Sequence, residues 1–374
     1  MTVSPSPTVA PGASSTKSMR ALVKAHADVG LEFDAARPLP TGSHGVMGEP
    51  GPREVMIRVH MAGICGTDKH IWEWDEWAAG RIPVGIVTGH EFVGVVEKIG
   101  SAVERITVGE RVSAEGHITS GRDYNSRTGN AHIARDMEIL GVDRDGCFAD
   151  YVIVPEENVW QLHDDIPDRY GAILDPFGNA VHTVMSADVS TKTVLITGVG
   201  MIGLMSVPVA RAAGAARIFV TDMNPDHLAL AKKLGADDTI LASEEGWVER
   251  VIDETRGDGV DVLLEMSGAQ RAIDDGFRSL RRGGTAAILG IPREPPRFDL
   301  TDHIIFKGST VIGVNGRRMW ETWYQMENLL LTGRVELDDI ITHTLPLEEY
   351  GAGFDLLLRN EALKIVLDIN GPTR

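Results

Sequence analysis

Hydrophobic and polar positions divide the chain into two halves with different periodicity. From Met19 to about Val154, short β-type runs are separated by glycine and proline turns, which favours a β-rich barrel. After Asn179, strands alternate with amphipathic helices, which is typical of a parallel sheet with helical crossovers. The sequence therefore predicts an α/β protein in which a doubly wound parallel sheet follows a β-rich domain. The β-type runs of the first half are Ala21–Ala25, Val55–Met61, Phe92–Val96 and Phe148–Val154.

The second half can be read element by element. Its predicted strands are Thr193–Thr197, Ile218–Thr221, Val260–Met266, Thr285–Leu289 and Thr310–Val314. Its predicted helices are Met201–Ala213, Pro225–Leu234 and Gln270–Leu280. Beyond them we predict a helix that ends at Leu331, with short strands near Ile340–Thr344 and Ile365–Ile369. This last part is expected to fold back onto the first domain.

The patterns predict three parts in the chain. Residues 1–18 are rich in serine, proline and threonine and carry one charge, so we expect a disordered tail. A transit peptide is a weaker alternative, because the segment has no arginine. A β-rich domain is expected over 19–178 and 319–374. A domain with a parallel sheet and helical crossovers is expected over 179–318.

Composition narrows the class of protein. The chain has 374 residues, with 36 Lys and Arg against 54 Asp and Glu, which gives a net charge of −18. This charge argues against a nucleic acid or an anionic membrane as partner. Two cysteines exclude a disulfide framework and favour a reducing, cytoplasmic location. The most apolar stretch, 200–213, is shorter than the ~20 residues that span a bilayer, so we predict no membrane segment.

A glycine pattern follows the strand that ends at Thr197. Gly198 allows a tight turn, Gly200 lets the backbone approach a pyrophosphate, and Gly203 permits close packing of helix on strand. Asp222 ends the next strand, 19 residues past Gly203, where a carboxylate can bind the ribose hydroxyls. That carboxylate would repel a 2′-phosphate, and residues 223–226 include no arginine, so NAD is predicted rather than NADP. The alternative is a plain glycine turn with a helix-capping aspartate.

A second set of residues is of the kinds that bind a catalytic zinc. Cys65, His90 and Glu91 supply a thiol, an imidazole and a carboxylate, and such a site needs about three protein ligands with one open position. Asp175 adds a carboxylate beside an expected turn, Leu174–Asn179, where the two domains meet. Taken singly, Cys65 is more often a buried apolar residue than a ligand, and His90 is more often a satisfied core histidine.

Several segments resemble the zinc-dependent medium-chain dehydrogenase/reductase superfamily. They are G-I-C-G-T-D-x-H at 63–70, G-H-E at 89–91, D-P-F-G-N-A-V-H at 175–182 and the glycine pattern at 198–203. Four further segments are similar to the L-threonine 3-dehydrogenases of that superfamily: 74–77, 115–119, 265–269 and 321–324. The resemblance extends from about Met19 to Asp368, so it covers nearly the whole chain. It implies a GroES-like catalytic domain over 19–178 and 319–374 and an NAD-binding domain of the Rossmann type over 179–318.

The resemblance implies a role for each matched residue. Cys65 and His90 would hold one catalytic zinc, with Glu91 and Asp175 as carboxylates that ligate or exchange in its shell. Many relatives have glutamate at this position, and the side chain of Asp175 is one methylene shorter than that of glutamate. Thr67 and His70 match the proton relay of the family. The matched NAD contacts are Ile202, Asp222, Leu289, Gly290, Ile291, Val314 and Asn315. Taken alone, residues 289–291 are about as consistent with a buried strand end as with a cofactor contact.

The chain departs from the superfamily at a loop that often holds a second, structural zinc on four cysteines. Ser120, Asp123, Ser126 and Ala134 stand at those four places. Hydroxyls and a methyl group do not replace thiolates on a closed tetrahedral zinc, so we predict that the structural zinc is absent. Cys147, the other cysteine, lies in a β-type run and is predicted to serve packing.

The resemblance implies zinc-dependent oxidation of a secondary alcohol with hydride transfer to NAD. The implied substrate is L-threonine and the implied product 2-amino-3-oxobutanoate. Two alternatives remain: a polyol or sugar dehydrogenase of the same superfamily, and a non-catalytic NAD-binding regulatory protein. His117 is a candidate substrate contact, although a plain loop histidine explains it equally well. The only partners implied are a small-molecule substrate and further copies of the chain, as a dimer or tetramer.

Overall fold

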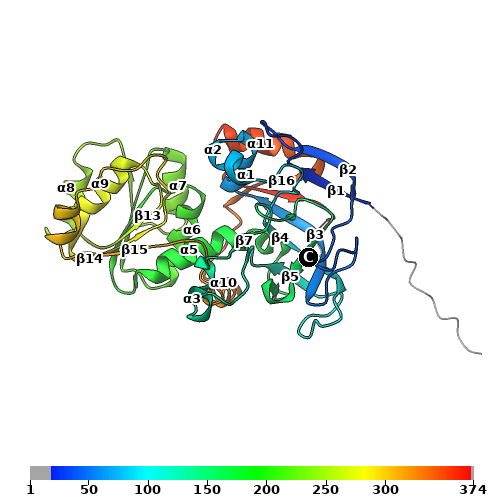
Figure 1. Cartoon of the computed structure of the whole chain (residues 1–374). Coiled ribbons are helices and arrows are strands. Elements are labelled where there is room, and N and C mark those ends of the chain that lie inside the picture. Colours follow the sequence, from blue (N-terminus) through cyan, green and yellow to red (C-terminus); the bar gives the residue numbers. More distant parts are fainter. Residues whose placement is uncertain (1–17, 372–374) are drawn as a thin grey trace, which may run out of the picture.

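The computed structural model describes residues 18–371 and shows two halves side by side, joined through two helices (Figure 1). One half is built on a parallel sheet and the other on a mixed, mainly antiparallel sheet, so the predicted α/β class is confirmed. The predicted tail lies outside the described residues except for Ser18, which is the first residue of strand β1 rather than part of a tail.

The parallel sheet has six strands in the order β12-β11-β10-β13-β14-β15. Every neighbouring pair is parallel, and the order reverses between β10 and β13, which is where doubly wound sheets bind ligands. The strands are β10 (Thr193–Thr197), β11 (Arg217–Asp222), β12 (Asp238–Leu241), β13 (Val260–Glu265), β14 (Leu280–Ile288) and β15 (Thr310–Gly313). The helices between them are α6 (Met201–Ala212), α7 (Pro225–Lys233), α8 (Trp247–Glu254) and α9 (Gln270–Ser279).

Alternate residues of β10 explain why helices cover both faces of this sheet. Val194 and Ile196 pack into the cluster that includes α6, whereas Leu195 packs with Trp247 and Phe277 from α8 and α9. Successive side chains of a strand point to opposite faces, so a strand whose central residues are all apolar needs cover on both faces. The strand–helix alternation predicted for this half is therefore confirmed, with β12 and α8 as elements that the sequence pattern did not reveal.

The other half contains a sheet of order β16-β17-β3-β4-β5-β9, with β8 paired to β3. Strand β17 runs antiparallel to β3, with Ile365 opposite Ile64, which confirms that the end of the chain folds back onto the first half. These strands are β3 (Glu54–Ile64), β4 (Glu91–Ile99), β5 (Arg111–Ala114), β8 (Tyr151–Pro155), β9 (Val159–Gln161), β16 (Ile341–Pro346) and β17 (Lys364–Asp368). Two further strand pairs are β1 (Ser18–Val23) with β2 (Glu32–Pro38) and β6 (His117–Ile118) with β7 (Glu138–Ile139).

Short helices complete this half. Helices α1 (Gly66–Glu73) and α2 (Glu76–Arg81) follow β3 directly and were not predicted. The remaining short segments are α3 (Tyr124–Arg127), α4 (Asp168–Gly171), α11 (Tyr350–Leu358) and the single turns 131–133, 156–158 and 347–349, with a π-type turn at 301–305 in the other half. No helix among residues 18–371 is both long enough and apolar enough to span a bilayer.

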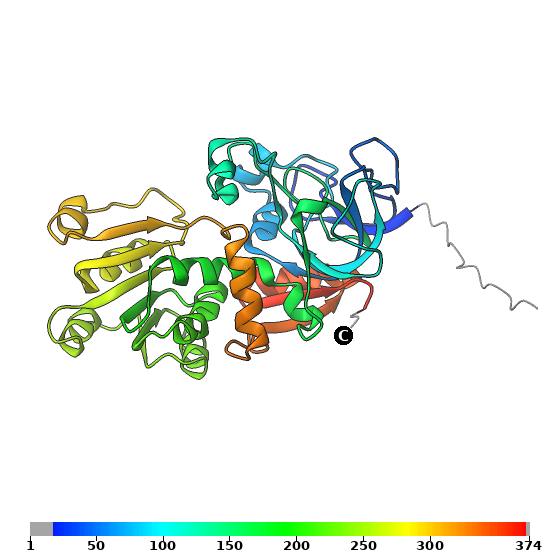
Figure 2. The same ribbon diagram turned by 90° about the horizontal axis from the view of Figure 1, so that it is seen from below.

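Helices α5 (Leu174–Ser186) and α10 (Glu321–Leu331) lie between the two halves. Figure 2 shows α10, in orange, upright between the sheet of the yellow and green half and the red strands of the other half, and α10 packs on α5. The turn predicted at Leu174–Asn179 is wrong, because these residues form the start of α5. Pro176 is the third residue of that helix, where the missing N–H costs no intrahelical hydrogen bond. Asp175 therefore lies in the first turn of a helix.

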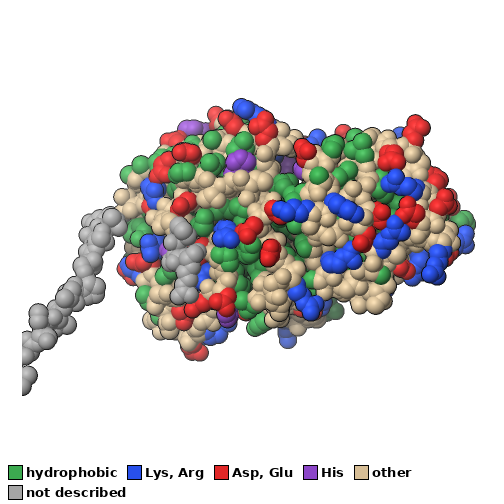
Figure 3. Space-filling model, turned by 180° about the vertical axis from the view of Figure 1, so that it is seen from behind, with side chains coloured by type: hydrophobic (Ala, Val, Ile, Leu, Met, Phe, Trp, Pro, Cys, Tyr) green, Lys and Arg blue, Asp and Glu red, His purple; other side chains and the backbone are tan. Residues whose placement is uncertain are grey.

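Charged side chains of both signs share the surface. On the face shown in Figure 3, acidic and basic side chains are interspersed over the half that carries the six-stranded sheet. In this half of the protein many charged side chains are paired, as in Arg217 with Asp238 at 2.7 Å and Arg278 with Glu249 at 2.7 Å. Exposed pairs of this kind contribute little to stability, so the fold depends on the buried clusters rather than on its surface charge.

Candidate metal and dinucleotide site

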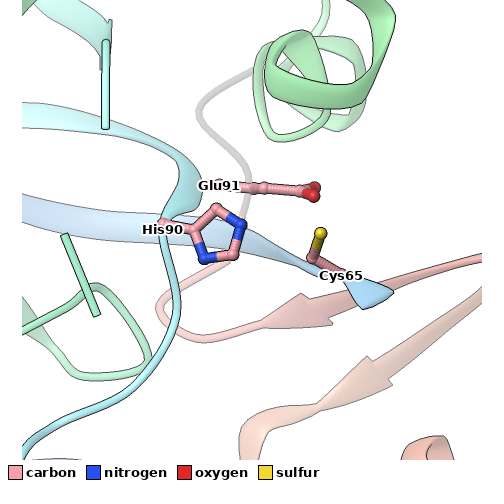
Figure 4. Close-up of side chains that lie close together, drawn as sticks. All are labelled: Cys65, His90 and Glu91. Atoms are coloured by element: carbon pink, nitrogen blue, oxygen red, sulfur yellow. The ribbon is translucent and has the colours of Figure 1, made fainter. Parts of the chain in front are cut away.

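Cys65, His90 and Glu91 come together at the adjoining ends of β3 and β4. Their ligand atoms all lie within 4.8 Å of one another, and the three side chains converge in Figure 4. Cys65 follows β3 and caps α1, and its backbone N–H donates to Asp68 Oδ2 at 2.9 Å. Gly63 pairs with Glu91 across the sheet, and a Cβ at Gly63 would lie 2.4 Å from Glu91 Oε2. Only glycine leaves room for the carboxylate at this position.

The electrostatics of the cluster fit a divalent metal. Burial alone would lower the pKa of His90, but the nearby Cys65 sulfur, Asp68 and Asp175 outweigh it and raise that pKa to about 10. His90 Nδ1 is buried and has no hydrogen-bond partner among the described residues. A thiolate, an imidazole and a carboxylate are the ligand types of catalytic zinc sites, and zinc displaces the imidazole proton when it binds. The residues present therefore fit zinc.

Lys364 is a member of this site that the sequence did not reveal. Its ammonium Nζ lies 2.5 Å from Glu91 Oε2 and donates to the backbone oxygen of Ile64 at 2.7 Å, and both charged side chains are fully buried. Burial raises the pKa of Glu91, and the Lys364 ammonium opposes that rise. A metal that recruits Glu91 must therefore compete with Lys364 for the same carboxylate.

Asp175 lies outside the three-residue cluster and is paired with Arg317. Arg317 Nη1 is 2.5 Å from Asp175 Oδ2, and Arg317 Nε donates to Glu115 Oε2 at 2.9 Å. Glu115 also accepts from Trp323 Nε1 at 2.9 Å and lies 2.8 Å from His117 Nδ1. Burial alone would raise the pKa of Glu115, but Arg317 and His117 hold it well below its usual range.

This buried network, Asp175–Arg317–Glu115–His117–Trp323, joins β6, α5 and α10 near the metal cluster. Its charges are close enough for Asp175 to influence the pKa values of His90 and Glu91. His117, the candidate substrate contact, therefore has its Nδ1 engaged within the protein. The network fixes the positions of both Asp175 and His117.

Thr67 and His70 lie on one side of α1, since residues three apart share a helix face. Thr67 Oγ1 is 4.0 Å from Cys65 Sγ, so the hydroxyl borders the metal cluster. His70 is further out, with 56% of its side chain exposed, and its Nδ1 lies 2.6 Å from Asp75 Oδ2. The two residues thus lead from the metal cluster toward solvent, as a proton path requires.

The glycine turn has the conformation that a dinucleotide needs. Gly198 has φ +85°, and a Cβ at Gly203 would lie 2.2 Å from Gly198 O, so both positions require glycine. Gly200 caps α6 without a side-chain hydrogen bond and has open space around its Cα, which leaves the first N–H groups free for a phosphate. Ile202 lies in the first turn of α6. Asp222 ends β11 and accepts from Val199 N at 2.7 Å.

The other predicted cofactor contacts lie at the same edge of the sheet. Leu289 N and Gly290 N donate to Glu265 O at 2.9 and 3.1 Å, and a Cβ at Gly290 would lie 2.2 Å from Gly268 N. Ile291 is 88% exposed. Val314 N donates to Ile288 O at 2.9 Å, and Asn315 beside it is exposed. The structure therefore brings these segments to the carboxyl edge that also carries Gly198.

The loop without cysteines is held by two aspartates. Asp123 caps α3 and accepts from Ser126 N at 2.9 Å and from Arg135 N at 3.1 Å. These hydrogen bonds, led by the one from the Ser126 side chain, lower the pKa of Asp123 to about 2. Asp136 accepts from Thr119 Oγ1 at 2.8 Å and also from Ser120. Carboxylate hydrogen bonds therefore close this loop, while Cys147, fully buried, packs in the core as predicted.

Comparisons with known proteins agree with this geometry. Residues 51–164 match the alcohol dehydrogenase GroES-like domain, and residues 201–332 match the zinc-binding dehydrogenase family. The L-threonine 3-dehydrogenase of Sinorhizobium medicae is 45% identical over 94% of this chain and 99% of its own length. The alcohol dehydrogenase from Thermus sp. ATN1 is 29% identical, with a TM-score of 0.82 over 94% of this chain and 100% of that one. A zinc-binding dehydrogenase from Sinorhizobium meliloti, bound to NADP, is 28% identical with a TM-score of 0.83 over 94% and 99%.

Proposed function

Because the chain belongs to the zinc-binding alcohol dehydrogenase family, we propose that it oxidises the secondary hydroxyl of L-threonine to 2-amino-3-oxobutanoate and reduces NAD. The resemblance to medium-chain dehydrogenases is thereby confirmed, and the chain is an enzyme that uses zinc and a nicotinamide cofactor. The assignment of L-threonine as substrate rests on the match to an L-threonine 3-dehydrogenase over nearly the full length of both chains.

The side chains of the metal cluster suit this reaction. Cys65 and His90 would hold the zinc, while Glu91 and Asp175 remain as nearby carboxylates held by Lys364 and Arg317. Bound zinc supplies Lewis acidity that lowers the pKa of the substrate hydroxyl, and bound NAD accepts the hydride. Thr67 Oγ1 receives the hydroxyl proton and gives its own toward His70, which releases it to water. One hydride and one proton thus leave the substrate.

The proposal also covers the number of zinc ions, the cofactor contacts and the role of His117. We propose one catalytic zinc per chain and no structural zinc, because aspartate hydrogen bonds close the loop at 119–136. Leu289, Gly290, Ile291, Val314 and Asn315 would face the nicotinamide end of NAD, and a bound cofactor would cover the exposed Ile291. His117 would contact substrate through its remaining ring nitrogen. Assembly as a dimer or tetramer and a cytoplasmic location remain predictions.

Substitution of Asp222 by asparagine should weaken the choice of NAD over NADP by about tenfold or more. Asparagine keeps an acceptor for Val199 N but removes the charge that repels a 2′-phosphate, and a hydrogen bond to a charged group contributes about 1.5–3 kcal/mol. The measurement is kcat/KM for both cofactors. Asp226→Asn removes a charge four residues further on, in the exposed first turn of α7, and should leave the ratio unchanged. Equal shifts in the two variants would contradict the role of Asp222.

A substrate panel tests the proposed reaction directly. NAD reduction would be followed with L-threonine, sorbitol, glucose and 2,3-butanediol, before and after chelation of the metal. We expect turnover of L-threonine that is lost on chelation and restored by zinc. A preference for sorbitol, glucose or 2,3-butanediol would replace the threonine assignment with a polyol or sugar dehydrogenase. Turnover of none of the four would contradict the proposed function.

A further inference from the structure

The segment Trp74–Trp77 resembles the L-threonine 3-dehydrogenases, and its contacts with the site described so far are those of Asp75 and Trp77 with His70. Trp74 and Asp75 connect α1 to α2, and Glu76 and Trp77 are the first residues of α2. Trp74 ends α1 in the left-handed conformation, with φ 54° and ψ 45°, so the chain reverses sharply there. The reversal brings Asp75 back beside His70, which lies one turn earlier on α1.

Asp75 uses its two carboxylate oxygens for two different tasks. Oδ1 accepts from Ala78 N at 2.9 Å and so caps the N-terminus of α2. Oδ2 lies 2.6 Å from His70 Nδ1, a distance typical of a charge-assisted hydrogen bond. Burial would raise the pKa of Asp75, but the hydrogen bonds from Ala78 and His70 lower it, so the carboxylate is ionised at neutral pH.

The two tryptophans hold this arrangement in place. The ammonium of Lys24 lies 4.6 Å from the centre of the Trp74 ring, which fixes the turn by a cation–π contact. The Trp77 ring meets the His70 ring edge-on, with centroids 6.1 Å apart at 69°. The Arg81 guanidinium lies 6.0 Å from the centre of the Trp77 ring and is itself bound to Asp143 at 2.7 Å. His70 is thus confined by a carboxylate and by an aromatic ring.

We propose that Asp75 is a positioning residue for His70: its carboxylate accepts a hydrogen bond from Nδ1–H, which keeps that proton on Nδ1 and leaves Nε2 free to receive the proton of the reaction. A neutral histidine has one donor and one acceptor nitrogen, and the partner of one nitrogen decides the tautomer. The same logic explains why a serine protease loses activity when its aspartate becomes asparagine, since the wrong tautomer results. The inference rests on the proton transfer assigned to His70 under the proposed function.

Asp75→Asn is the informative variant, because asparagine is an equally good helix cap and preserves the fold of α2. Its amide can donate as well as accept, so it no longer enforces the Nδ1–H tautomer of His70. We expect kcat with L-threonine to fall about tenfold, with KM changed less than twofold, since general acid–base steps contribute about 10²–10⁴-fold in total and solvent reaches His70. The tautomer is read by 15N NMR of the histidine ring, assigned with His70→Asn.

Asp123→Asn is the matched control. Asp123 also caps a short helix, with Ser126 N at 2.9 Å, but its described partners include no histidine. The proposal expects wild-type kcat in Asp123→Asn and non-additive losses when Asp75→Asn is combined with His70→Asn. Wild-type kcat in Asp75→Asn, or an unchanged His70 tautomer, would overturn it, as would equal losses in both aspartate variants. Because the NMR readout requires no turnover, a wild-type enzyme inert toward L-threonine contradicts the proposed function without obscuring the test of Asp75.

Discussion

Replacement of Cys65 by serine is expected to remove the bound zinc and to lower kcat/KM more than about a thousandfold. A serine hydroxyl stays protonated at neutral pH and is a poor zinc ligand, whereas the thiolate supplies both charge and soft sulfur. Lewis acidity lowers the barrier by several kcal/mol, and each 1.36 kcal/mol corresponds to about tenfold in rate. The measurements are zinc per chain by elemental analysis and NAD reduction with saturating zinc in the buffer.

Cys147→Ala is the control for the loss of a thiol. Cys147 is fully buried, and within residues 18–371 its sulfur donates to the backbone oxygen of Glu91, at 3.6 Å. Burial raises the pKa of the Cys147 thiol well above its usual range, so it does not supply a thiolate. We expect one zinc per chain, wild-type kcat and a stability loss of about 1 kcal/mol from the small cavity. A Cys65→Ser protein that still holds one zinc would show that the cluster is not the metal site.

Local periodicity explains why most of the parallel-sheet half could be predicted. The run 193–197 is apolar on both faces and is followed at once by Gly198, Gly200 and Gly203, so strand, turn and helix all follow from neighbouring residues. The cluster of Cys65, His90 and Glu91 was predictable for another reason. Its ligand types are rare together, and the resemblance joined segments that lie apart in the chain.

The buried cations of the site could not be predicted in the same way. Lys364 and Arg317 are residues that normally lie at the surface, and their partners are distant in the sequence. Arg317 binds Glu115 across 202 residues, and Lys364 binds the backbone of Ile64 across 300. The one local signal was Lys364 itself, a charge directly before the apolar run Ile365–Leu367 of β17. The pairing of β17 with β3 brings Lys364 to Glu91, and the sequence alone did not show this contact.

The contacts that hold the loop at 119–136 could not be predicted from the sequence either. The sequence revealed that the four cysteines are missing, but not that Asp123 would cap α3 or that Asp136 would bind Thr119. Both contacts are made over short distances along the chain, yet they depend on a loop conformation that no periodic pattern encodes. The sequence therefore shows that the metal ligands are missing, but it does not show which contacts stabilise the loop in their place.

Replacement of Arg317 by methionine is expected to lower the free energy of unfolding by about 3–5 kcal/mol. The variant would leave the fully buried carboxylate of Glu115 and the partly buried one of Asp175 without their guanidinium partner, and an uncompensated buried charge has about this cost. The measurement is urea denaturation of the zinc-loaded protein. In the wild type, the low pKa of Glu115 contributes stability that is present at neutral pH and lost as the pH falls below the usual glutamate range.

The pH dependence separates this explanation from a simple packing defect. Without Arg317, Glu115 is protonated more readily, so acidification should narrow the stability gap between variant and wild type. Arg318→Met is the matched control, because Arg318 is half exposed and pairs with Glu321 at 3.1 Å on the surface. It should cost no more than about 1 kcal/mol at any pH. If Arg317→Met were equally mild, or if its gap were constant with pH, the charge of Arg317 would not be what holds Asp175 and Glu115 in the site.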